Sequence, residues 1–169
     1  MAEGSVTAEF DFISYKIDAI SMKMGNDANY LMNIGPIKPD CIKLSIKLRN
    51  TEKFNIDGIV TYIGGLMTQI RITNEVDGPM MLEGQFGISG MFTSKKTVDK
   101  QTEEAFAKVN LPALLMPYLR ATMTNIISNA GFGTMLFPLI NIYELAKTQN
   151  LSIIDRSEKV LSFTPPLGK

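Results

Sequence analysis

Residues 111–130 read LPALLMPYLRATMTNIISNA, and this stretch decides the fold. Its apolar residues recur at helical spacing, yet Arg120 is its only charged side chain and the only one between Lys108 and Glu144. A helix on the surface of a protein normally keeps a charged face toward water. The stretch therefore predicts a helix that is covered on both sides.

The predicted helix has two contrasting arcs when its residues are placed about 100° apart. One broad arc carries large apolar side chains, namely Leu111, Leu115, Leu119, Met123, Ile126 and Ile127. The opposite arc carries a stripe of small side chains, namely Ala113, Pro117, Ala121, Thr124 and Ser128. The large arc fits a sheet of the same subunit, and a small stripe lets a second helix approach closely. We expect this helix at an oligomer interface; the alternative is a helix buried within one monomer.

Prolines and a glycine divide the region around this helix. Pro112 suits a first helical turn, whereas Pro117 lies inside the helix and is expected to kink it, because its ring removes a backbone hydrogen bond. Gly131 is expected to end the helix in a left-handed turn. The connector that follows, 132–139, is uncharged and unusually apolar for a loop, so it either packs under another element or lines a groove for a ligand. A second helix is predicted at about 141–149, capped by its first residue, an asparagine.

The composition is that of globular protein, with 169 residues of which 45% are hydrophobic and 20% charged. We expect one domain at 1–150 and a mobile C-terminal tail at 151–169. Seventeen basic residues balance seventeen acidic ones, which argues against a nucleic-acid partner or an anionic membrane. Cys41 is the only cysteine, which is typical of the reducing cytoplasm. A signal peptide and a membrane-spanning segment are not expected.

The inventory of reactive side chains argues against an enzyme. The chain has no histidine and one cysteine, which removes the commonest general base and a zinc site. The glycine-rich segments YIGGLM and GQFGISG match neither a Walker loop nor a dinucleotide fingerprint. We therefore expect no catalytic residue, no metal and no cofactor. The eleven methionines favour a surface that adapts to varied apolar partners.

Strands are predicted before the helices. Residues 6–24 form a long strand whose apolar positions are Phe10, Phe12, Ile13, Tyr15, Ile17, Ile20, Met22 and Met24. The alternation changes phase twice, which is typical of a strand with bulges. Residues 41–50 alternate cleanly, with Ile42, Leu44, Ile46 and Leu48 on one face and polar side chains on the other. Two further strands, at about 66–75 and 80–92, flank the turn VDGP as a hairpin.

Four segments, in a consistent order over about residues 9–148, resemble the SecB family of bacterial export chaperones. The most specific is LPALLMPYLRATMTNIISNAGF, which looks like the family's main helix with its Pro-Tyr-x-Arg motif. LFPLINIYELA is similar to the proline-led entry into the family's last helix, apart from one inserted residue. DAISMKM looks like the Ile-Ser-aromatic segment of the first strand. IKPDCIKLSIKL looks like the lead-in to the second strand, with Ile37 where the family has tryptophan.

The resemblance implies an α+β fold, with a four-stranded antiparallel sheet, two C-terminal helices and the long helix at the interface of a dimer of dimers. It also implies an ATP-independent chaperone that keeps unfolded or precursor polypeptides export- or assembly-competent in an apolar groove. By position, the resemblance implies that the client groove is lined by Phe132, Met135, Leu136, Phe137, Leu139 and Tyr143, and on the sheet side by Ile42, Leu44 and Ile46. Core packing is the alternative for each of these side chains.

The acidic surface with which the family docks onto the SecA motor is altered in this chain. Ala19 and Lys23 stand where the family has acidic residues, and Asp18 is one residue out of register. Glu83 retains a third acidic position, with Met81 on the same face. We therefore expect weakened docking onto a basic motor surface.

Three functions stay open from the sequence. The first is a general export chaperone, and the second is a dedicated chaperone of an antitoxin, a role that other SecB-like proteins have. The third belongs to a different class, namely a binding module for a small apolar ligand or a structural protein of a larger assembly.

Overall fold

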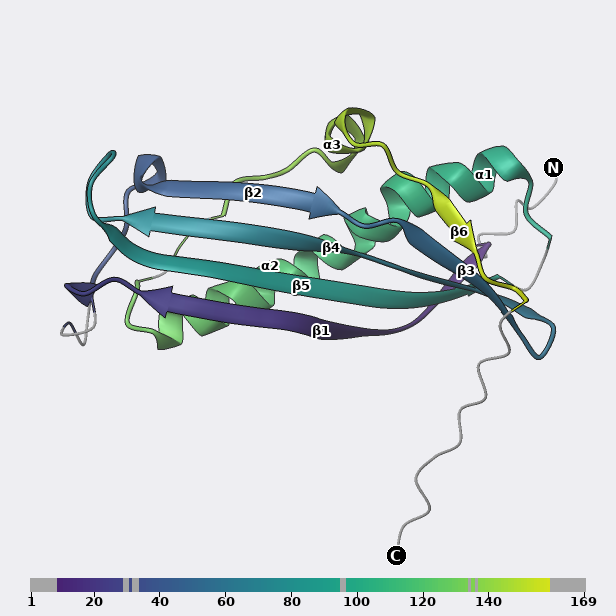
Figure 1. Cartoon of the computed structure of the whole chain (residues 1–169), viewed down its shortest axis with the longest axis horizontal. Helices are drawn as coiled ribbons and strands as arrows, with labels where there is room; N and C mark the ends of the chain where they lie inside the picture. The colour runs from purple at the N-terminus through teal and green to yellow at the C-terminus, as the bar shows by residue number, and fades with distance from the viewer. Residues whose placement is uncertain are drawn as a thin grey trace, which may run out of the picture.

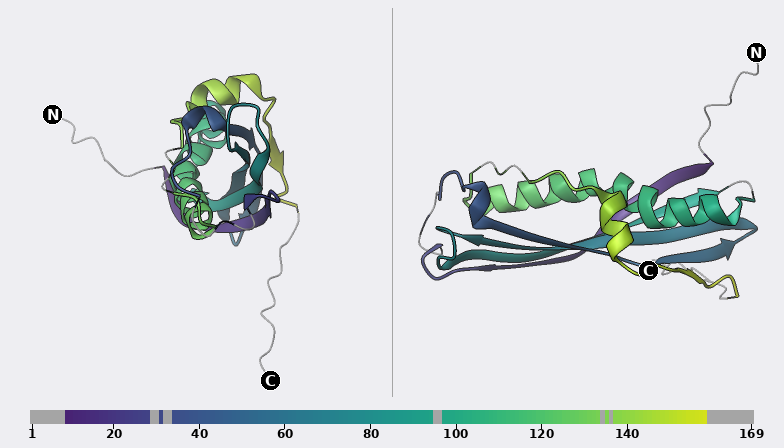
Figure 2. Two further views of the ribbon diagram at one scale, coloured as in Figure 1. Left: turned by 90° about the vertical axis from the view of Figure 1, so that its left-hand side faces the viewer. Right: turned by 90° about the horizontal axis from the view of Figure 1, so that it is seen from above.

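The computed structural model describes residues 9–28, 31, 34–94, 97–133, 135 and 137–158. The strands are β1 (Phe10–Met24), β2 (Ile42–Leu48), β3 (Thr51–Ile56), β4 (Ile59–Thr73), β5 (Met80–Ser94) and β6 (Ile153–Asp155). The helices are the 3-10 helix η2 (Pro39–Cys41), α1 (Lys100–Ala105), the π-helix η3 (Phe106–Asn110), α2 (Leu111–Asn129) and α3 (Ile142–Thr148). An elongated sheet forms one layer, and α1, η3 and α2 run along one face of it (Figure 1; Figure 2). The α+β class is confirmed; we call the sheet face toward α2 the inner face and the opposite one the outer face.

The sheet contains six strands where four were expected. β1, β5, β4, β3 and β6 are neighbours in that order, and β2 also pairs with β4. β2 and β3 share one edge of β4 and are separated at Arg49 and Asn50. The pairing is antiparallel except between β3 and β6. β3 is not recognised in the sequence, because it is short and carries two charged residues. The signal that was present is the Asp-Gly turn of a hairpin, formed by Asp57 and Gly58 with φ of 52° and 81°.

β1 confirms the expected bulges. Its register with β5 shifts between Phe12 and Ser14 and again between Ile17 and Ala19. Each shift adds one residue and turns the side chains that follow to the other face. The bulges thereby keep most apolar side chains of β1 on the inner face, namely Phe10, Phe12, Tyr15, Ile17, Ile20, Met22 and Met24.

α2 packs over β4 and β5, as its large apolar arc predicts. Leu111, Leu115, Leu119, Met123 and Ile127 are buried, and Ile126 is half-buried. Gly64 and Gly90 are partners across β4 and β5, directly beneath the helix. A Cβ atom added at Gly90 would lie 2.6 Å from Cδ2 of Leu115. The two glycine-rich segments therefore let the helix approach the sheet closely, which explains them without a phosphate-binding role.

The helical layer starts before residue 111 and is continuous from α1 through η3 to α2. The helix begins after Asp99, whose side chain accepts a hydrogen bond from the backbone N–H of Thr102 at 3.0 Å and caps it. The N–H of Leu111 bonds to the carbonyl of Phe106, five residues back. This wide π turn makes room for the ring of Pro112, which lies inside a continuous helical run and not at its start.

Glu103 ties this helical layer to the sheet. Its carboxylate accepts a hydrogen bond from Tyr62 Oη at 2.6 Å and pairs with Lys53 Nζ at 2.6 Å. Burial of the ring, and next the hydrogen bond to Glu103, raise the pKa of Tyr62 far above its usual range. Tyr62 therefore stays a neutral donor throughout the ordinary pH range.

The C-terminal part of the described chain covers one edge of the sheet. α3 is capped by Asn141 as predicted, since its side chain accepts from the N–H of Glu144 at 3.2 Å. The side chain of Gln149 then accepts from the N–H of Leu48 at 2.8 Å and donates to the carbonyl of Ile46 at 3.0 Å. β6 continues along β3, so the first part of the expected tail is paired into the sheet. Residues 159–169 of that tail lie outside the described residues.

Candidate functional site

The connector between α2 and α3 runs back along α2 toward the middle of the molecule (Figure 1). Gly131 ends α2 with a φ of 91°, and its carbonyl accepts a hydrogen bond from the N–H of Ile34 at 2.8 Å. Arg120 donates from Nη2 to the carbonyl of Phe137 at 2.8 Å. The one charged side chain of the opening stretch is therefore an internal anchor, and a hydrogen bond from a charged donor is stronger than a neutral one.

The structure divides the connector residues expected to line a groove. Phe132, Met135 and Phe137 are only 2%, 4% and 6% exposed, because they pack into the core beside α2. Leu139 is 90% exposed and Tyr143 is 55% exposed. Leu136 lies outside the described residues. The described part of the connector is thus largely packed. We call Leu139, on the connector, and Tyr143, on α3, the connector surface.

The three sheet residues expected to join this groove lie on the inner face of β2. Ile42, Leu44 and Ile46 are half-buried and pack against the core, whereas Lys43, Ser45 and Lys47 are exposed on the outer face. The predicted alternation of this strand is confirmed. A role of these side chains in binding a client stays a prediction.

A larger apolar surface, which the sequence analysis does not anticipate, lies where β1 extends beyond the edge of α2. We call it the β1–α2 surface; its exposed members are Phe12, Tyr15, Ile20, Met22, Leu114 and Tyr118. The ring of Tyr118 lies 4.5 Å from that of Tyr15 and 5.8 Å from that of Phe12, between centroids. The inner-face apolar positions of β1 are the signal that could have revealed it, because one helix is too narrow to cover four strands.

The stripe of small residues on α2 faces away from the sheet. Ala113, Pro117, Ala121 and Ser128 are exposed, and Thr124 is half-buried. The stripe therefore borders the β1–α2 surface, since Leu114 and Tyr118 lie three residues before Pro117 and Ala121 on the same helix. Its place at an oligomer interface stays a prediction.

The two residues expected to dock a motor are separated by burial. Glu83 is exposed on the outer face, but Met81 is 8% exposed and belongs to the core. Lys23 is the cross-strand partner of Glu83. The outer face thus presents Glu83 next to a cation and without the expected apolar neighbour.

Asp18, the out-of-register carboxylate, crosses the outer face to the opposite edge of the sheet. Its oxygens accept hydrogen bonds from Arg49 Nη1 and Nη2, both at 2.8 Å, and a short hydrogen bond from the hydroxyl of Ser89. The Arg49 guanidinium beside Asp18, aided by Ser89, holds the pKa of that carboxyl below its usual range. A Cβ atom at Gly87 would lie 2.7 Å from Asp18 Oδ1, so this pair needs the bare glycine beneath it. The carboxylate of Asp18 is therefore already paired with Arg49 and Ser89 of the same chain.

The described residues bring no group of three or more cysteine, aspartate or glutamate side chains together as a metal site. Within the same ranges, no helix is long and apolar enough to cross a membrane. The features that distinguish this chain are therefore its surfaces: two apolar ones on the helix side, and a polar outer face.

The sheet, the long helix and the connector define the fold of a SecB-like protein. The family model described as "Preprotein translocase subunit SecB" matches residues 19–151. Because the match covers most of the chain, the chain belongs to the SecB family, which confirms the resemblance.

Two individual proteins are also similar. A SecB-like chaperone of Mycobacterium tuberculosis, solved in complex with a ChAD peptide from the HigA1 antitoxin, has a TM-score of 0.57 and 11% identity, over 78% of this chain and 91% of that one. At this identity, the likeness shows the fold alone. The uncharacterized protein MJ0357 of Methanocaldococcus jannaschii is 27% identical over 119 residues, which are 67% of this chain and 72% of that protein.

Proposed function

We propose that this chain is an ATP-independent chaperone that binds unfolded polypeptides through its connector surface. The observation that carries the proposal is the exposure of Leu139, at 90%, on a connector in which Phe132, Met135 and Phe137 are packed, and of Tyr143, at 55%, in the first turn of α3. Large apolar side chains held in water gain free energy when another apolar chain covers them. Membership of the SecB family supports a chaperone role.

The buried residues of the connector offer a way to enlarge this surface. Phe132, Met135 and Phe137 lie beneath the same segment, and Arg120 is its anchor at Phe137. A client that displaced this anchor would add these three side chains to its binding surface, and the half-buried Ile42, Leu44 and Ile46 of β2 are the candidates on the sheet side. A methionine in such a place adapts to clients of different shape.

The test compares an unfolded, reduced polypeptide with the same polypeptide in its folded form. Leu139→Asp and Tyr143→Asp are expected to weaken binding of the unfolded form about fivefold or more, because a charge replaces an apolar contact. Val76→Asp is the matched control, since Val76 is 61% exposed in the turn between β4 and β5. Isothermal titration without nucleotide measures the affinities. Equal affinity in all three variants, or binding of the folded form, would contradict the proposal.

A dedicated version of the same function is favoured by one comparison, in which a SecB-like chaperone carries an antitoxin peptide. A dedicated chaperone would bind one partner tightly and unrelated unfolded polypeptides weakly, whereas a general export chaperone would bind a panel of them with similar affinity. The same titration with several unrelated clients therefore separates the two. A module for a small apolar ligand would be indifferent to the folding state of every polypeptide.

We also propose that the protein works as a homo-oligomer, a dimer of dimers. The β1–α2 surface presents six large exposed apolar side chains, three of which, Phe12, Tyr15 and Tyr118, are in ring contact, and exposed apolar side chains in this number are typical of an interface. A sister helix on the small stripe of α2 would cover the stripe and this surface. Precursor clients and a cytoplasmic location belong to the same proposal, whereas delivery to the SecA motor is expected to be weakened, because Ala19 and Lys23 replace two acidic residues of the family's docking surface.

A further inference from the structure

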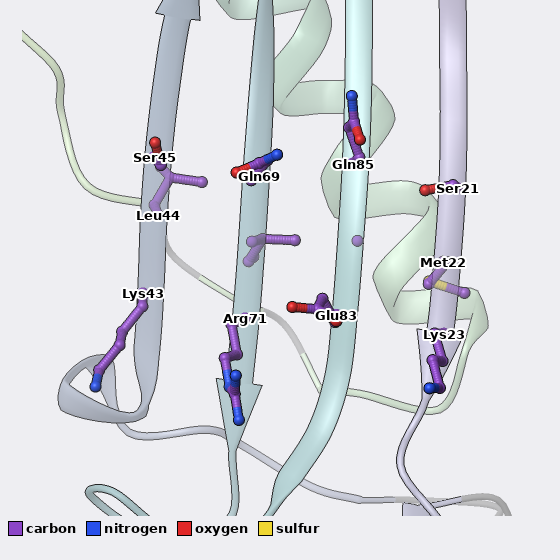
Figure 3. A pocket seen from close by; sticks show the side chains of 12 residues that line it. Ser21, Met22, Lys23, Lys43, Leu44, Ser45, Gln69, Arg71, Glu83 and Gln85 are labelled. Atoms are coloured by element: carbon purple, nitrogen blue, oxygen red, sulfur yellow. The ribbon is translucent and has the colours of Figure 1, made fainter.

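The outer face of the sheet carries a shallow hollow of about 520 Å³ at the end of β4. Its charged lining consists of three cations, Lys23, Lys43 and Arg71, and one carboxylate, Glu83. They form one row across four strands, with Glu83 on β5 between Arg71 and Lys23 (Figure 3). The chain as a whole is neutral, with seventeen basic and seventeen acidic residues, so this excess of positive charge is local.

The cations of this row are compensated only in part, because one carboxylate, Glu83, is the direct cross-strand partner of both Lys23 and Arg71. Lys43 and Arg71 are direct partners across β2 and β4, and like charges at such positions destabilise a sheet. Lys43 has one ion pair, to Asp77 at 3.1 Å, but the two side chains are 67% and 79% exposed. Lys23 and Arg71 form no ion pair with any residue that the structure describes. An anionic partner would offset this repulsion.

The rest of the lining fits a polypeptide. Ser21, Ser45, Gln69 and Gln85 form the next row along the same four strands. Hydroxyl and amide groups can both donate and accept, so they match the backbone groups of an extended segment. Neighbouring strands lie about 5 Å apart, which puts Arg71 and Lys23 about 10 Å apart and within reach of neighbouring carboxylates on one segment. The hollow therefore offers cations for side chains and neutral groups for a backbone.

From this arrangement, we propose that the outer face docks an acidic segment of a partner protein. The partner's carboxylates contact Lys23, Lys43 and Arg71, and Glu83 limits the affinity. Three cations are fewer than the four to eight typical of anionic-lipid recognition, and a neutral chain lacks the basic footprint of a nucleic-acid binder. The proposal does not depend on client binding, because the hollow and the connector surface share no residue.

The test uses the full chain and a fluorescein-labelled, glutamate-rich peptide of about twelve residues, followed by fluorescence anisotropy at low and physiological salt. Lys23→Glu combined with Arg71→Glu is expected to lower the affinity about tenfold, because two attractions become repulsions. Lys100→Glu is the matched control, since Lys100 is exposed at the other end of the molecule (Figure 1). Lys23 and Arg71 are both exposed, so their substitution is not expected to unfold the chain. Circular dichroism checks that the variants fold.

The direction in which Glu83→Gln changes the affinity distinguishes an acidic partner from a basic one. An acidic partner predicts about threefold tighter binding when this carboxylate is removed, whereas a basic partner predicts weaker binding. No binding of the peptide, an equal loss in Lys100→Glu, or weaker binding in Glu83→Gln would each overturn the proposal. Tighter binding of a lysine-rich peptide or of a single-stranded oligonucleotide of similar length would overturn it as well.

Discussion

At the scale of single residues, Asp18 shows how a β-bulge changes the direction and the partner of a side chain. The register shift between Ile17 and Ala19 leaves Asp18 outside the regular alternation, and it joins Arg49 across the outer face. Its side chain is 17% exposed and that of Arg49 is 34% exposed, so water screens the pair only in part. The pair links the two edges of the sheet, which are not neighbours in the strand order of the described residues.

Asp18→Asn is expected to lower the free energy of unfolding at pH 7 by about 1–2 kcal/mol, because Arg49 loses a charged partner. The pKa of Asp18 is lowered from 3.8 in the folded chain. The stability that this carboxylate contributes is therefore present above that value and is lost as the pH falls through the lowered one. Urea unfolding at pH 7 and at about pH 2 measures this contribution to the free energy of unfolding. The difference between the wild-type chain and Asp18→Asn should shrink in acid, and Asp27→Asn, in an exposed turn, should show neither effect.

At the scale of elements, the connector depends on an anchor that sequence periodicity cannot identify. Arg120→Met keeps much of the apolar stem of the side chain but removes the bond to the Phe137 carbonyl. We expect the connector amides near residue 137 to exchange at least about fivefold faster, because a lost charge-assisted hydrogen bond costs about 1–3 kcal/mol. Hydrogen exchange followed by mass spectrometry measures it. Arg71→Met is the control, and equal protection in both variants would mean that packing alone holds the connector.

The sequence predicts those elements whose burial repeats along one face. The phase changes of β1 locate its bulges, and the arc of large apolar side chains that begins at Leu111 identifies the face of α2 that packs on the sheet. β3 and β6 escape prediction because they are short, and β6 pairs with a strand about a hundred residues earlier. The connector escapes for a different reason: Phe137 and Leu139 look alike in sequence, and only the path of the backbone decides that one is buried and the other exposed.

At the scale of the whole molecule, the β1–α2 surface and the small stripe predict self-association. Ala121→Arg places a long charged side chain on the stripe and is expected to reduce the mass, because a buried unpaired charge in an interface is costly. Light scattering should give about four times the mass of one chain for the wild type and a smaller multiple for the variant. Asn129→Arg, at the exposed last position of α2, is the control. A wild-type monomer, or an unchanged mass in Ala121→Arg, would contradict the proposed interface.

The coverage of one sheet edge by Gln149 and β6 limits how copies of this chain can add to one another. Gln149 engages Ile46 and Leu48, and β6 pairs with Thr51, Glu52 and Lys53, whereas β1 ends the strand order on the other side. Polymerisation by strand addition needs two receptive ends on every unit, since each added unit must offer a fresh end to the next. Gln149 and the short β6 cover part of one edge, so strand addition is favoured at β1, the long edge strand on the other side. This difference between the two edges opposes open-ended growth by strand addition.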